Sequence, residues 1–320
     1  MSVDSAFDTY QTTVNANPDQ VTEARRRRDL FKTSFAGEAD VAEVRVSGSL
    51  ARGTQKDPIH DVDTVIVFKA LSHPDWGQPG GSAEDALNHV QTRVRELLGT
   101  NGNHAAGEVR RSTWRNHAVK CFMDDKDDDE AFTVDAMPAL LDGDRLLIPE
   151  FTSKKWVPAD PQYLIDEVNR KHAAWNKFAG TVRVLKAWGK SQDIEIKSLV
   201  MEVLALSYLP TGNTRPIALR TFFTTAAYAM ESGVRVTDPA NICGEIQKDL
   251  DYAKFAQCLR AASTEAALAV SDQASSDDAG AIRHWGKVFG SKFPDPPKTG
   301  KGPAVVPPVV PRPVKDTPQG

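Results

Sequence analysis

Cysteine is scarce in this sequence, and the few cysteines are placed neither for a metal site nor for a disulfide framework. The three cysteines, Cys121, Cys243 and Cys258, lie far apart and form no C-x-x-C motif. This pattern disfavours a zinc site as well as a set of structural disulfides. Internal repeats are also lacking, so we do not expect a solenoid.

Long apolar runs and an excess of positive charge are absent too. No uninterrupted apolar stretch reaches the length of a membrane span, and the first residues lack the basic and apolar segments of a signal peptide. We therefore expect a cytoplasmic protein without a membrane partner. The net charge of −4 gives no overall basic field, so the composition does not require a nucleic-acid partner.

One stretch combines features that are uncommon in a purely structural segment. Residues 41–46 alternate apolar and charged side chains as a strand does, and the alternation stops at Gly48 and Ser49. Asp61 and Asp63 then precede an apolar run that is typical of a strand buried on both faces. Because side chains at i and i+2 of a strand point the same way, we expect these carboxylates side by side.

A divalent cation would explain why two carboxylates are held so close together. Mg²⁺ takes oxygen ligands and is commonly bound by carboxylates together with substrate phosphates. A turn at Gly48 and Ser49 lets the backbone approach closely and offers N–H groups and a hydroxyl to such phosphates. Either feature alone is weak, because a Gly-Ser pair is usually only a turn and an Asp-x-Asp is usually solvated. Together they predict a site for a nucleoside triphosphate and its metal.

The order of these motifs resembles the DNA polymerase β-like nucleotidyltransferase superfamily. The matching motifs are Gly48-Ser49, Gly53-Thr54 and Asp61-x-Asp63. The resemblance implies that Gly48, Ser49 and Thr54 contribute to nucleotide binding.

Asp135 is a further carboxylate, placed among apolar neighbours in an expected strand, residues 131–137. A buried carboxylate must be paired, bound to a metal or located at a sheet end. Taken alone, Asp135 is best interpreted as a hydrogen-bonded strand end. With Asp61 and Asp63 on an expected neighbouring strand, it becomes a candidate ligand of a two-metal site. The segment Val134-Asp135-x-x-Pro138-Ala139 resembles the bacterial CD-NTases, the cGAS/DncV-like synthases of cyclic oligonucleotides.

Two charged runs have simpler interpretations than binding. The arginines at 25–28 lie in a helix expected from Asn17-Pro18 to about Phe35, and they point around most of its circumference, as on a solvated, partly salt-bridged helix. The acidic run at 124–130 lacks the spacing and the glycine of a calcium loop, so we interpret it as an exposed turn between strands.

The second half of the chain is expected to be helical. Apolar residues recur at steps of three and four from Pro161 to about Lys190, and further helices are expected at 198–209, 215–231 and 250–270. The family resemblance, which spans residues 18–294, implies that Lys186 and Ser198 face the triphosphate. A cation and a helix-starting hydroxyl suit phosphate, although either could equally be a surface residue.

These observations predict an α+β fold of two lobes with the active site in the cleft between them. Residues 1–155 would form an amino-terminal helix and a catalytic core with a mixed sheet, and residues 156–294 a helical lobe. Residues 295–320 are rich in proline and are expected to be a disordered tail. The resemblance allows an accessory protein to act on this tail through Gly320.

The resemblance implies metal-assisted nucleotidyl transfer. Asp61, Asp63 and Asp135 would hold a pair of Mg²⁺ ions, for which Mn²⁺ can substitute. The substrates would be ribonucleoside triphosphates such as ATP or GTP, joined into a cyclic di- or trinucleotide messenger with release of pyrophosphate, in bacterial anti-phage signalling of the CBASS kind. Three alternatives stay open: a transferase that modifies a protein, a small molecule or an RNA end; a catalytically silent nucleic-acid sensor; and a scaffold organised by the tail.

Overall fold

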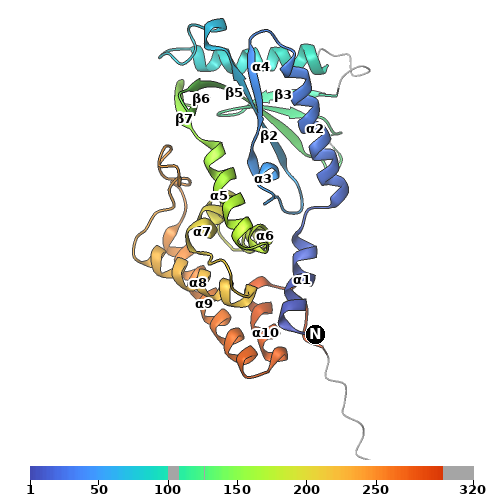
Figure 1. The fold of residues 1–320 in the computed structure, drawn as a ribbon, viewed down its shortest axis with the longest axis vertical. Coiled ribbons are helices and arrows are strands. Elements are labelled where there is room, and N and C mark those ends of the chain that lie inside the picture. The colour runs from blue at the N-terminus through green and yellow to red at the C-terminus, as the bar shows by residue number, and fades with distance from the viewer. Residues whose placement is uncertain (100–107, 126, 298–320) are drawn as a thin grey trace, which may run out of the picture.

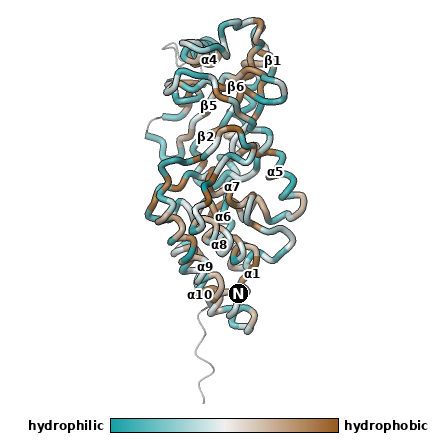
Figure 2. The backbone as a smooth tube through the Cα atoms, turned by 90° about the vertical axis from the view of Figure 1, so that its left-hand side faces the viewer, coloured by the Kyte–Doolittle hydropathy of each residue, from teal (hydrophilic) through white to brown (hydrophobic). Residues whose placement is uncertain are grey.

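The structure, a computed structural model, describes residues 1–99, 108–125 and 127–297, which form an elongated molecule of two lobes (Figure 1). A β-sheet with helices α2 and α4 occupies one end, and helices alone occupy the other. The side view in Figure 2 shows the same division, with β1, β2, β5 and β6 in one half and α6 to α10 in the other. We call these halves the sheet lobe and the helical lobe. Within the described ranges, no helix has both the length and the apolar character that crossing a membrane requires.

The sheet lobe is built on a mixed sheet, as predicted. Its strands are β1 (Val41–Val46), β2 (Asp61–Phe68), β3 (Arg111–Trp114), β4 (Val119–Phe122), β5 (Thr133–Asp142), β6 (Arg145–Glu150) and β7 (Lys155–Ala159). Their order is β1-β2-β5-β4-β3, and β6 pairs with β5 and then with β7. Among the described strands β2 and β5 pair in parallel, whereas the other pairs are antiparallel.

Two helices bury one face of this sheet. They are α2 (Pro18–Ala36) and α4 (Ser82–Leu98), and the short α3 (Gly48–Ala51) and the 3-10 helix η1 (Ala70–Ser72) lie between strands. The start of α2 agrees with the prediction, because the Asn17 side chain accepts a hydrogen bond from the Asp19 N–H and Pro18 is the first helical residue. Apolar side chains of α2, α4, β2 and β5 form one cluster, which includes Phe31, Phe35, Leu87, Val90, Val62, Ile66 and Val134.

The helical lobe has its own apolar core. Its helices are α1 (Val3–Val14), α5 (Pro161–Ala174), α6 (Phe178–Lys190), α7 (Ser198–Tyr208), α8 (Arg215–Glu231), α9 (Tyr252–Ala274) and α10 (Asp278–Phe289). The apolar stripe predicted along residues 161–190 lies in this core, with Trp188 and Phe178 fully or almost fully buried. The helix predicted at 215–231 has the observed bounds of α8.

Three parts of the fold differ from the sequence-based expectation. The single long helix predicted from Pro161 to Lys190 is two helices, because Trp175 has an extended backbone and ends α5. The helix α1 was not predicted, and it packs into the core of the helical lobe rather than against the sheet. The strands β6 and β7 were also not predicted, and with them the sheet extends to Ala159. The predicted domain division at residue 155 stays a prediction.

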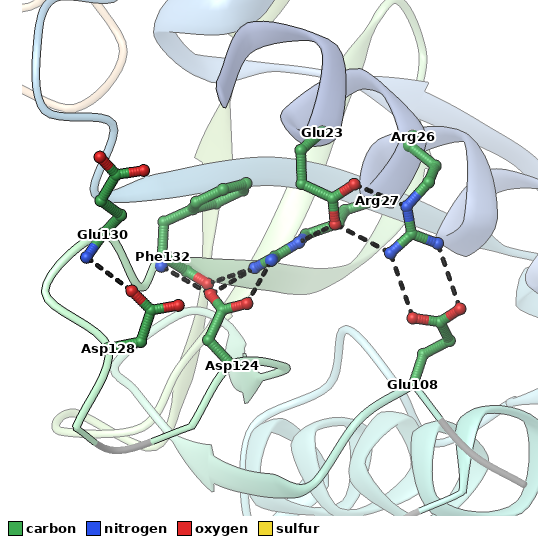
Figure 3. A network of polar contacts seen from close by, with 8 residues as sticks. All are labelled: Glu23, Arg26, Arg27, Glu108, Asp124, Asp128, Glu130 and Phe132. Carbon is green, nitrogen blue, oxygen red and sulfur yellow. Dashed lines mark hydrogen bonds and ion pairs between the residues drawn. The ribbon is translucent and has the colours of Figure 1, made fainter. Parts of the chain in front are cut away.

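The arginine run in α2 is less solvated than the sequence suggested. Arg26 is half-exposed and pairs with Glu23 and Glu108, as expected of a salt-bridged surface (Figure 3). Arg27 is buried, and its guanidinium lies 3.9 Å from the centre of the Phe132 ring and donates to the Phe132 carbonyl oxygen at 2.8 Å. The expectation of a solvated side chain is therefore wrong for Arg27, because only its neighbours on the helix point outward.

Asp124, the first residue of the acidic run, is the partner of this buried arginine. Its carboxylate accepts hydrogen bonds from Arg27, one of them at 2.7 Å, and from the Phe132 N–H at 2.9 Å (Figure 3). Asp128 follows the prediction of an exposed turn and accepts from the Glu130 N–H at 2.9 Å. Asp124 does not follow that prediction, because its hydrogen bonds join the β4–β5 connection to α2. Lys126, in the same run, lies outside the described residues.

Candidate functional site

The predicted carboxylates come together on two adjacent strands. Asp63 of β2 is directly opposite Asp135 of β5, and Asp61 is opposite Thr133. Because Asp61 and Asp63 are two residues apart on β2, they share the face of the sheet that Asp135 also occupies. The parallel register of β2 and β5 thus gathers the three side chains that the sequence separates by more than seventy residues.

Burial and mutual repulsion make this group of carboxylates electrostatically unfavourable. Burial, followed by the charges of Asp61 and Asp135, raises the pKa of Asp63 to about 7, against the opposing effect of Arg52 and Lys120. Burial also raises the pKa of Asp135, and Lys120, directly opposite on β4, opposes that shift.

The group has the donor set that a hard divalent cation requires. The Oδ1 atom of Asp135 is buried and has no hydrogen-bond partner among the described residues. Asp61 and Asp63 add carboxylate oxygens on the same face. An unpaired buried carboxylate oxygen beside further carboxylates fits Mg²⁺ or Mn²⁺, which bind oxygen ligands.

Gly48 brings the backbone against this group. A Cβ atom at position 48 would lie 1.7 Å from Asp63 Oδ2, and the residue has φ of +70°, which favours glycine. The preceding Ser47 N–H donates to the Asp63 carbonyl oxygen at 3.2 Å. The backbone thus lies close to the Asp63 side chain, and its approach to a phosphate stays a prediction. Gly48 and Ser49 begin the short helix α3 and do not form a simple turn.

A cleft of about 180 Å³ lies next to the carboxylates and collects most of the other predicted residues. It is lined by Ser49, Thr54, Gln55, Lys56, Pro58, Ile59, His60, Asp61, Lys186 and Ser198. Predicted residues from both lobes therefore share one cleft, as expected for an active site between lobes. Asp63, Asp135 and Gly48 are not among the residues that line this cleft.

Lys186 is a buried residue of the lobe interface. Its Nζ forms an ion pair with Glu202 of α7 and lies 3.1 Å from the Thr54 hydroxyl and 3.2 Å from the Thr54 carbonyl oxygen. The alternative that Lys186 is a surface residue is therefore wrong. Ser198 is exposed, and it is the first residue of α7 after the N-cap position of Lys197.

Glu202 connects the lobes through Arg52, which follows α3, and through Thr54. Its carboxylate is fully buried and accepts from Arg52 Nε at 2.6 Å and from the Thr54 hydroxyl at 2.9 Å. Burial by itself would raise the pKa of Glu202, but Lys186 and Arg52 outweigh it and lower the pKa to about 2. Arg52 and Lys186 thus share the buried carboxylate of Glu202, next to the cleft that Lys186 lines.

Several known proteins are similar to this chain in sequence or in structure. No protein-family model matches the chain. A curated protein of Bacillus cereus (strain VD146), described as a probable cyclic nucleotide synthase, is 24% identical over 343 residues, which cover 92% of this chain and 98% of that protein.

Solved structures agree over almost the whole chain. The structure of E. coli MS115-1 CdnC with ATP matches with a TM-score of 0.70 and 17% identity, over 92% of this chain and 99% of CdnC. The structure of the Bradyrhizobium diazoefficiens CD-NTase CdnG with GTP matches with a TM-score of 0.64 and 11% identity, over 89% of this chain and 96% of CdnG. The chain has the CD-NTase fold. The resemblance drawn from the motifs is confirmed, and the same matches support the prediction of a nucleotidyltransferase.

Within this CD-NTase fold, the sequence-based analysis missed three charged residues of the site. Lys120 lies opposite Asp135, and Arg52 and Glu202 form the buried ion pair under the cleft. Glu202 had a visible signal, because it is a single acidic residue in the otherwise apolar helix predicted at 198–209. Lys120 and Arg52 had no such signal, since exposed cations are common in strands and loops.

Proposed function

We propose that this chain is a metal-dependent nucleotidyltransferase that joins and cyclises ribonucleoside triphosphates. The observation that carries the proposal is the register of β2 and β5, which places Asp61, Asp63 and Asp135 on one face beside a cleft shared by both lobes. The cyclic nucleotide synthase named in the Bacillus relative and the nucleotides bound in CdnC and CdnG support it.

The three carboxylates would hold a pair of Mg²⁺ or Mn²⁺ ions. When bound, such ions supply positive charge at the transferring phosphoryl group and at the leaving oxygen. The fit rests on the unpaired Oδ1 of Asp135 and on the raised pKa of Asp63, which indicate that Lys120 and Arg52 do not fully compensate the charge of these carboxylates.

The remaining residues would bind and orient the donor nucleotide. The Ser49 and Ser198 hydroxyls face the cleft from the two lobes and would donate to phosphate oxygens. Thr54 lines the same cleft and positions Lys186. The backbone at Gly48 would approach the triphosphate where side chains are excluded.

The transfer itself would run as an in-line displacement. The acceptor ribose hydroxyl oxygen forms a bond to the α-phosphorus, its proton goes to the Asp135 carboxylate, and the bond from the α-phosphorus to the bridging oxygen breaks. Pyrophosphate leaves with the electron pair of that bond. A second transfer within the linear product closes the ring.

The cellular role follows from the same family. We propose that the cyclic product is a messenger in bacterial anti-phage signalling of the CBASS kind and that the protein works in the cytoplasm. The predicted action of an accessory protein on Gly320 stays a prediction, because residues 298–320 lie outside the described residues.

The deciding experiment incubates the purified protein with all four labelled ribonucleoside triphosphates and Mg²⁺ or Mn²⁺, followed by phosphatase and mass spectrometry. We expect a phosphatase-resistant cyclic product from the wild type and none from the Asp61→Asn/Asp63→Asn variant. Asp193→Asn, at an exposed aspartate outside the cleft, is the matched control and should keep the product. Linear or protein-attached nucleotide would instead support a transferase that modifies another acceptor.

A further inference from the structure

A second group of possible metal ligands lies in the sheet lobe, and the proposed transfer does not use it. The Asp40 Oδ2 atom lies 2.9 Å from Nε2 of His73 and 2.9 Å from Nε2 of His89. The three potential ligand atoms all lie within 4.8 Å of one another. Asp40 precedes β1, His73 follows η1 and His89 belongs to α4, so the fold brings together residues that the sequence keeps apart.

We propose that Asp40, His73 and His89 bind a divalent transition-metal cation of the Zn²⁺ class. Two imidazole nitrogens and one carboxylate oxygen are a donor set that Zn²⁺ binds, whereas Mg²⁺ prefers oxygen ligands alone. The site is thus chemically distinct from the carboxylates of Asp61, Asp63 and Asp135. It does not depend on the proposed transferase activity.

The two distances from Asp40 require only a small adjustment, and the ligand atoms of the two imidazoles lie within 4.8 Å of each other. In tetrahedral coordination with metal–ligand bonds of about 2.0–2.1 Å, ligand atoms lie roughly 3.3 Å apart. The two separations of 2.9 Å from Asp40 would each open by about half an ångström, which small side-chain rotations can supply. Three protein ligands leave one position for water or another donor.

Aromatic packing holds the two imidazoles in place. The His73 ring stacks on Trp76 with centroids 3.8 Å apart, and Phe68 meets the rings of His73 and His89 edge-on at 5.4 and 5.3 Å. The backbone around Asp40 is also fixed, because the Lys69 N–H donates to its carbonyl oxygen at 2.8 Å. Ligands held by packing and backbone hydrogen bonds are preorganised for a metal.

An ion can reach the group from solvent. The side chains of His73, Asp40 and His89 are 14%, 23% and 29% exposed, so the cluster is neither sealed nor fully solvated. Bound metal would join the start of β1, the segment after η1 and α4. The lack of a C-x-x-C motif is compatible with this site, because no cysteine is needed.

The competing explanation is a hydrogen-bonded cluster in which both imidazoles donate Nε2–H to Asp40 and no metal binds. The two explanations differ in what metal-stripped protein does when cobalt or zinc is added. Co²⁺ reports coordination directly, because tetrahedral nitrogen and oxygen ligation gives much stronger visible absorption, at longer wavelength, than the weak band of hexahydrated Co²⁺.

The test uses the full-length protein after dialysis against chelator and a Co²⁺ titration followed by visible absorption, with Zn²⁺ as competitor. We expect saturation near one equivalent, displacement by Zn²⁺, and loss of the absorption in both His73→Gln and His89→Gln. His172→Gln, at an exposed histidine of α5, is the matched control and should bind as the wild type does. The Asp61→Asn/Asp63→Asn variant should also keep the absorption.

X-ray absorption of the wild-type zinc complex makes the outcome independent of whether the variants fold. Two imidazole ligands in the first coordination shell would support the proposal. Absence of the strong absorption of tetrahedral Co²⁺ in the wild type, or zinc bound without imidazole, would overturn it. Equal binding by folded His73→Gln and His89→Gln proteins would overturn it as well.

Discussion

Gly48 is a residue at which the backbone passes close to Asp63, one of the proposed metal ligands. Alanine there would place its Cβ 1.7 Å from Asp63 Oδ2 and would hold a left-handed backbone conformation. We expect Gly48→Ala to lower nucleotidyl transfer at least 100-fold, because displacement of a ligand by about 1 Å costs that much. The measurement is the rate of product formation at saturating nucleotide.

Gly37→Ala is the matched control for this substitution. A Cβ at position 37 meets no atom within 4 Å, and the backbone there is right-handed. We expect its rate to stay within about twofold of the wild type, as for a surface substitution of small effect. Equal rates for Gly48→Ala and the wild type would show that Asp63 does not have to stay where the structure places it.

Glu202 is expected to matter for stability as much as for function. Glu202→Gln removes the charge that Arg52 and Lys186 share and leaves both cations buried. Breaking a buried ion pair in this way costs about 3–5 kcal/mol. Urea denaturation should show this loss, whereas Glu231→Gln, at an exposed pair with Arg260, should leave the midpoint near that of the wild type. Similar midpoints for both variants would contradict the buried network.

The same residue predicts a pH dependence. The pKa of Glu202 is about 2 in the folded protein, below the value of about 4.3 expected of an unfolded chain. A lowered folded-state pKa contributes stability that is fully present above pH ~5 and is lost as the pH falls towards 2. The stability difference between wild type and Glu202→Gln should therefore shrink as the pH is lowered from 6 to 3. Urea midpoints of the two proteins at matched pH values measure this, and a constant difference would refute it.

At the scale of elements, α1 belongs physically to the helical lobe. Phe7 is fully buried, and its ring lies 5.1 Å from those of Trp285 and Phe293 and 5.8 Å from that of Phe289. Phe7→Ala is expected to destabilise the protein by about 3–5 kcal/mol through the cavity it leaves. Thermal unfolding would measure this, with the half-exposed Phe151→Ala as control. A negligible effect of Phe7→Ala would place α1 outside the core.

The elements predicted well are those whose signals are local. The Asn17-Pro18 start of α2 is determined by neighbours in sequence, and both α2 and the helix expected at 215–231 occur as predicted. The hairpin of β5 and β6 was missed although Asp142-Gly143 marks it, with Gly143 at φ of +62°. The break at Trp175 was missed because apolar spacing continues through it, and only packing shows that α5 and α6 are separate.

The candidate site was predictable to the extent that its residue types are unusual where they occur. Asp61 and Asp63 stand at the start of an apolar run, and Asp135 stands between apolar neighbours, so all three attracted notice from the sequence. The role given to Asp135 also required the assumption of a neighbouring strand, which the register of β2 and β5 bears out. The group of Asp40, His73 and His89 had no such signal, because its members come from three separate segments. A local sequence pattern cannot identify a site whose residues come together only through long-range contacts.

At the scale of the whole molecule, catalysis should not require the proline-rich tail. The described cleft and carboxylates lie within residues 48–198, so a chain shortened to residue 297 should form the same phosphatase-resistant product at a similar rate. Product analysis of the shortened and full-length proteins tests this. Loss of basal product in the shortened chain would overturn this prediction and show that catalysis needs the tail.

The parallel pairing of β2 and β5 also sets the moment at which the chain can act during its own synthesis. Parallel neighbours need a long connection, and here β3 and β4 are made before β5 can insert beside β2. A ribosome-bound chain that ends before residue 135 already carries Asp61 and Asp63 but lacks their counterpart, and the carboxylate that engages Lys186 arrives later still, at residue 202. An unfinished chain therefore lacks the complete group of carboxylates, and the proposed transfer would require a molecule whose translation has passed residue 202.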